Sequence, residues 1–110
     1  MAIDWNQVGS DVQKAVVGVL GNDWKIVKTG ASAQITALVS VAQSIEQASF
    51  AGTLTKLEYE SLKASQQNAL SGILHSYAAI GIVVAQQAAA AAWNVVASAL
   101  TKGLGIPFAL

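Results

Sequence analysis

The segment from Ala64 to Thr101 lies between two lysines and contains neither a formally charged side chain nor a proline. The absence of proline lets it continue as a helix. A helix that is both long and neutral cannot keep its outer face solvated by charges, so it must bury much of its circumference. We expect it to do so in copies of itself, in a partner or in lipid.

The composition favours association. Of the 110 residues, 54% are hydrophobic and 11% are charged, whereas globular domains carry roughly 25% charged residues. Much of the apolar content is alanine, which buries little area and gives a thin core. We therefore expect residues 1–110 to form a single domain that gains part of its stability as a homo-oligomer.

The same composition argues against several functions. The chain has six lysines, six acidic residues and no arginine, so it lacks the basic surface that nucleic acids require. It has no cysteine, and its only histidine, His75, is not part of a Glu-x-x-His pair. No Gly-x-Ser-x-Gly elbow or phosphate loop occurs. We expect no catalytic or metal site, no cofactor and no small-molecule substrate.

Helical signals cover the first half of the chain. Apolar residues recur every three or four positions, which predicts helices over about 4–20 and 23–49. Between them, Gly21-Asn22-Asp23 breaks the pattern. Because the apolar stripe keeps its phase across the break, we interpret these residues as a kink or short joint between roughly collinear helices.

The reversal of the chain is predicted after Phe50, at Gly52. Thr55 and Glu58 then form a capping box, which starts the next helix. That helix is expected over about 55–102, and an apolar tail, 103–110, follows it. The predicted fold is all-α: a long antiparallel helical hairpin with a kinked or jointed first arm, assembling into a helical bundle or larger helical oligomer.

The apolar face of the last helix is the predicted contact between copies. Its residues recur at a spacing of eleven, which predicts straight or slightly right-handed packing. We expect the oligomer interface to contain Leu62, Ile73, Tyr77, Val84, Ala88, Ala91, Trp93 and Val95.

A membrane-active protein is an alternative. Ala78–Leu100 is long enough to cross a bilayer, as a pore-forming, ejection or lysis component would require. Gln86, Gln87 and Asn94 disfavour a helix that faces lipid on all sides. They suit a helix that lines a pore or packs against other helices.

The Phe50-Ala51-Gly52 turn resembles the Trp-x-Gly turn of the WXG100 family. The resemblance implies a small secreted helical hairpin that dimerises into a four-helix bundle. The chain departs from the family in its longer, less charged second helix. Its tail also lacks the Tyr-x-x-x-Asp/Glu export signal.

Of these alternatives, we favour a protein that assembles with copies of itself, as a structural subunit of a virion, filament or similar assembly. The N-terminus lacks a basic region followed by an apolar core, so no Sec signal peptide is expected. The location would then be cytoplasmic, virion-associated or reached by a non-Sec export route.

Overall fold

The computed structural model describes residues 3–105, and within that range it is helical throughout except for short connections. This confirms the all-α prediction. The elements in chain order are α1 (Trp5–Leu20), the 3₁₀ turn η1 (Gly21–Asp23), α2 (Trp24–Phe50), α3 (Lys56–His75) and α4 (Ile82–Leu104).

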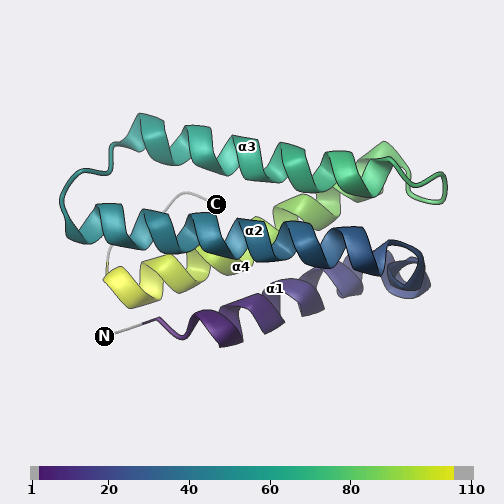
Figure 1. Ribbon diagram of the computed structural model, residues 1–110, viewed down its shortest axis with the longest axis horizontal. Helices are drawn as coiled ribbons and strands as arrows, with labels where there is room; N and C mark the ends of the chain where they lie inside the picture. Colours follow the sequence, from purple (N-terminus) through teal and green to yellow (C-terminus); the bar gives the residue numbers. More distant parts are fainter. Residues whose placement is uncertain (1–2, 106–110) are drawn as a thin grey trace.

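The four α-helices lie side by side and alternate in direction along the long axis of the molecule (Figure 1). α2 and α4 each contact all the other helices, whereas α1 and α3 do not touch within the described residues. α4 is the most buried helix. Its buried residues are Ala85, Ala88, Ala89, Ala92, Trp93, Val96, Ala97 and Leu100.

The joint at Gly21–Asp23 is present, but the helices that it connects are antiparallel instead of collinear. Two collinear helices of this length would span about 70 Å at 1.5 Å per residue, and the longest dimension of the molecule is 42 Å. Gly21 adopts a positive φ of 58°, a conformation that costs glycine little. The apolar stripe keeps its phase because both helices bury it in the same core.

The predicted continuous helix over 55–102 is wrong, because it is divided into α3 and α4. The Ser76 hydroxyl donates to the carbonyl of Ile73 at 2.6 Å, which satisfies a carbonyl near the end of α3. Gly81 is extended and precedes α4. The neutral segment therefore folds back on itself. Part of the apolar surface that was predicted to contact other copies is covered by helices of the same chain.

The turn between α2 and α3 lies where the sequence predicts it. Gly52 has a φ of 71°, and the Thr55 hydroxyl accepts a hydrogen bond from the backbone N–H of Glu58 at 3.1 Å. At the other predicted stop, α4 continues through Gly103 to Leu104, and Gly105 is the left-handed residue that ends it. Residues 106–110 of the predicted tail lie outside the described residues.

Gly103 is needed for packing instead of for termination. A Cβ atom at this position would collide with the side chain of Ile3, so glycine lets the start of the chain lie against the last turn of α4.

Candidate functional site

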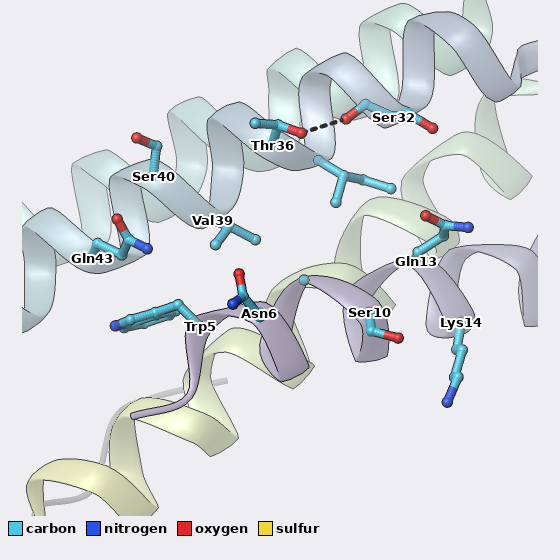
Figure 2. A pocket seen from close by; sticks show the side chains of 12 residues that line it. Trp5, Asn6, Ser10, Gln13, Lys14, Ser32, Thr36, Val39, Ser40 and Gln43 are labelled. Carbon is cyan, nitrogen blue, oxygen red and sulfur yellow. Dashed lines mark hydrogen bonds between the residues drawn. The ribbon is translucent and has the colours of Figure 1, made fainter. Parts of the chain in front are cut away.

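A groove of about 550 Å³ runs between α1 and α2 (Figure 2). At one end, the Trp5 indole N–H donates to a carboxylate oxygen of Glu46 at 3.0 Å and joins the start of α1 to the last turns of α2. The Thr36 hydroxyl donates to the carbonyl of Ser32 at 3.0 Å. The lining residues are Trp5, Asn6, Gly9, Ser10, Gln13, Lys14, Ser32, Ile35, Thr36, Val39, Ser40 and Gln43.

The lining of this groove is hydroxyl, amide and apolar, with Lys14 as its one charged side chain. A carboxylate or imidazole that could take a proton from a nucleophile is not among these residues, so the groove lacks the pairing that acid–base chemistry uses. It can offer hydrogen bonds to a polar surface.

A second groove, of about 440 Å³, lies between α1 and α4. Asp11 and Lys102 give it one charge of each sign, and small or amide side chains supply much of the remainder. Within residues 3–105, no group of three histidine, cysteine or carboxylate side chains is arranged to hold a metal ion.

His75 belongs to the connection between α3 and α4. Its Nδ1 atom lies 3.2 Å from the carbonyl oxygen of Ile80, a distance at which a protonated nitrogen donates. The side chain is otherwise exposed. Its contact therefore orders the turn that lets α4 fold back.

Tyr59 and Trp93 form a buried polar pair between α3 and α4. The Trp93 indole N–H donates to the Tyr59 hydroxyl at 3.1 Å, and the ring centroids are 6.1 Å apart at 54°. Burial raises the pKa of Tyr59; the hydrogen bond from Trp93 lowers it, and the nearby Glu60 carboxylate raises it further. The pair anchors the packing of α3 on α4.

This raised pKa predicts a loss of stability in alkali. Below the unfolded-state pKa of about 10 the tyrosine is neutral in both states. Above it, the unfolded state loses its proton first, so stability falls as pH rises towards the folded-state pKa. We expect the free energy of unfolding of wild type to fall more steeply above about pH 10 than that of Tyr59→Phe. Urea titrations at pH 8 and at higher pH values would measure both slopes, and equal slopes would contradict the assignment.

The structure places the predicted interface residues inside one copy or at the edge of its core. Ala88 and Trp93 are fully buried, so in this fold they cannot contact a second copy. This corrects the prediction for these two residues, because α1, α2 and α3 pack against α4 and cover its inner face. Leu62, Tyr77, Val84 and Val95 are half-buried and pack against the core, and Ile73 and Ala91 are half-buried as well.

Sequence reasoning missed most of the large apolar side chains that remain exposed. Among the described residues they are Ile26, Phe50, Leu57, Ile82 and Val83, and only Phe50 was singled out, as a turn residue. Leu57 lies outside the apolar stripe that α3 buries, and this position in the sequence could have predicted its exposure. The exposure of Ile82 and Val83 follows from the break before α4, and Gly81 at that break was not interpreted as a stop.

α4 is the one helix among the described residues with the length and hydropathy of a membrane span, at a mean hydropathy of 1.3. About two fifths of its most apolar window, 39%, is buried within the protein. The helix begins at Ile82, four residues later than the predicted span. Packing in the core of the protein therefore explains the apolar residues on the buried face of α4, which is less than half of this window.

No protein-family model matches the chain, and neither the curated proteins nor the solved structures contain a match.

Proposed function

We propose that the protein is a non-enzymatic structural subunit that assembles with copies of itself. The observation that carries this proposal is the exposure of five large apolar side chains within residues 3–105. Leu57 is 80% exposed, Phe50 69%, Val83 61%, Ile26 56% and Ile82 54%. Each would be covered, and its contact with water removed, in an interface between copies.

The rest of the surface supports the same proposal. The outward residues of α4, including Gln86, Gln87, Ala90 and Asn94, are exposed and uncharged. Burial in the core explains why the inner face of α4 is neutral, but it does not explain this outer face. A chain with zero net charge also has little electrostatic repulsion between copies. Such a surface would suit a subunit of a virion or of a filament.

The molar mass in detergent-free buffer tests this proposal. We expect size-exclusion chromatography with light scattering to give a mass above the 11.3 kDa of one chain, rising with protein concentration. The same measurement at several salt concentrations provides a control for non-specific charge association. A monomer mass at every concentration, up to the millimolar range, would contradict self-assembly.

The membrane-active alternative has one specific observation in its favour, the length and hydropathy of α4. To enter lipid, α4 would have to leave its contacts with α1 and α3 and expose the residues that they cover. Liposome flotation distinguishes the two functions. Protein that stays with the aqueous fraction as a defined assembly supports the structural subunit. Protein that floats with the vesicles and gains a protease-protected α4 supports membrane insertion.

A further inference from the structure

The exposed apolar side chains gather at the two opposite ends of the molecule. Phe50 is the last residue of α2 and Leu57 is the second residue of α3, so both flank the turn that joins these helices. We call this the turn end; it lies at the left of Figure 1. Ile82 and Val83 are the first residues of α4, and Ile26 is the third of α2, at the opposite or joint end.

The charges are also divided between the two ends. The half of the helices towards the turn end holds five acidic residues and three lysines, a balance of −2: Asp4, Asp11, Glu46, Glu58, Glu60, Lys56, Lys63 and Lys102. The half towards the joint end holds three lysines and one acidic residue, a balance of +2: Lys14, Lys25, Lys28 and Asp23.

From this arrangement we infer that copies of the chain join head to tail, the turn end of one copy against the joint end of the next. The inference rests on the proposed self-assembly and specifies its geometry. Lys25 and Lys28 stand on either side of Ile26. Around Leu57 the charges are Lys56 before it and Glu58 and Glu60 after it, a negative balance. Opposite ends therefore bring unlike charges together around apolar residues, whereas two identical ends would bring like charges together. A contact between different surfaces does not close on itself in a pair, so it can continue as a filament.

The size of the ends sets the strength of this contact. The molecule measures 26 by 19 Å across its long axis, which gives each end on the order of 500 Å² and a contact of about 1,000 Å² in total, near the lower limit for specific interfaces. The filament is therefore expected to shorten on dilution. Its axial repeat is expected to be close to the 42 Å length of the molecule.

Two matched substitutions block one end each. Leu57→Glu alters the turn end and Val83→Glu alters the joint end, and both positions are the exposed second residue of a helix. A carboxylate there is favourable for the helix dipole, so both variants should fold. In an end-to-end contact, however, the new carboxylate would have to give up its hydration where an apolar side chain was buried before, which is unfavourable. We expect each purified variant alone to be monomeric by sedimentation velocity at concentrations where wild type forms longer species.

Mixing the two variants is the decisive measurement. Leu57→Glu keeps an intact joint end and Val83→Glu keeps an intact turn end, so an equimolar mixture should form a discrete one-to-one dimer of twice the 11.3 kDa chain mass. A pairing of identical ends predicts a different result, because one of the variants would then dimerise alone. Ser65→Glu places the same charge at an exposed position in the middle of α3, away from both ends, and should assemble as wild type does.

The outcomes separate this inference from the proposed function. If wild type assembles and either end variant keeps the wild-type mass distribution, the head-to-tail contact is wrong and self-assembly stands. That result is also expected if lipid covers the turn end instead of a second copy. A mixture that stays monomeric likewise overturns the head-to-tail contact. A wild type that is monomeric throughout overturns both proposals. Circular dichroism of each variant must match wild type for the comparison to hold.

Discussion

Trp93→Ala is expected to lower the free energy of unfolding by about 3–5 kcal/mol, as large-to-small substitutions of buried aromatic residues do. Trp93 is the largest fully buried side chain in the described part of the chain. Its removal leaves a cavity between α3 and α4 and also takes away the hydrogen bond to Tyr59. Urea denaturation followed by far-ultraviolet circular dichroism would measure the change. A loss this large is a substantial part of the 5–15 kcal/mol that typically holds a domain together.

Tyr59→Phe is the matched control for the hydrogen bond. It keeps the ring against Trp93 and removes only the hydroxyl that accepts from the indole, so we expect a loss of about 1–2 kcal/mol. The double variant should lose less than the sum of the two single changes, because the two residues share one interaction. If Trp93→Ala instead costs less than about 1 kcal/mol and changes the oligomer mass, Trp93 lies at a surface between copies, as the sequence alone suggested.

Local signals were sufficient to predict the helices of the first half and the turn after them. The expected helices over 4–20 and 23–49 correspond closely to α1 and α2. Asp4 caps α1 by accepting from the backbone N–H of Gln7 at 3.2 Å, and Thr55 caps α3 in the same way. These features depend on residues within one helical turn of each other, which is why the sequence reveals them.

The direction of the chain was harder to predict, because it depends on contacts between distant residues. At Gly21–Asp23 a straight joint and a reversal leave the same apolar stripe in phase. At 76–81 the sequence has no proline, and Ala78 and Ala79 are good helix formers. The break there follows from tertiary packing, since folding back places α4 against α1 and α3 and covers its alanine stripe.

Which residues could contact another copy depends on where the chain reverses its direction. With one long helix, Ala88 and Trp93 would face another copy; with two helices they face the core of their own chain. The exposed ends, with Leu57 and Val83, exist only because the helices stop where they do. The uncharged segment was expected to be covered by copies of the chain, a partner or lipid, and the sequence did not show that the chain's own helices cover the inner face of α4.

Substitutions of the alanines in α4 test directly whether the other helices of the same chain pack closely against α4. Ala88 and Ala92 are both fully buried, one helical turn apart, on the face that meets the other helices. A larger side chain at either position has no room unless α4 moves away, so we expect Ala92→Leu to cost about 1–3 kcal/mol of stability. Leucine is nearly as good a helix former as alanine, so helix propensity contributes little to this loss.

Ala90→Leu is the control, because Ala90 lies two residues away on the same helix and is exposed. We expect its free energy of unfolding in urea to stay within about 0.5 kcal/mol of wild type. Equal stabilities for the two variants would mean that α4 is not held closely between its neighbours. A large difference would explain why this stretch is both uncharged and rich in alanine: a charge would lose its water in the core, and a larger side chain would hold the helices apart.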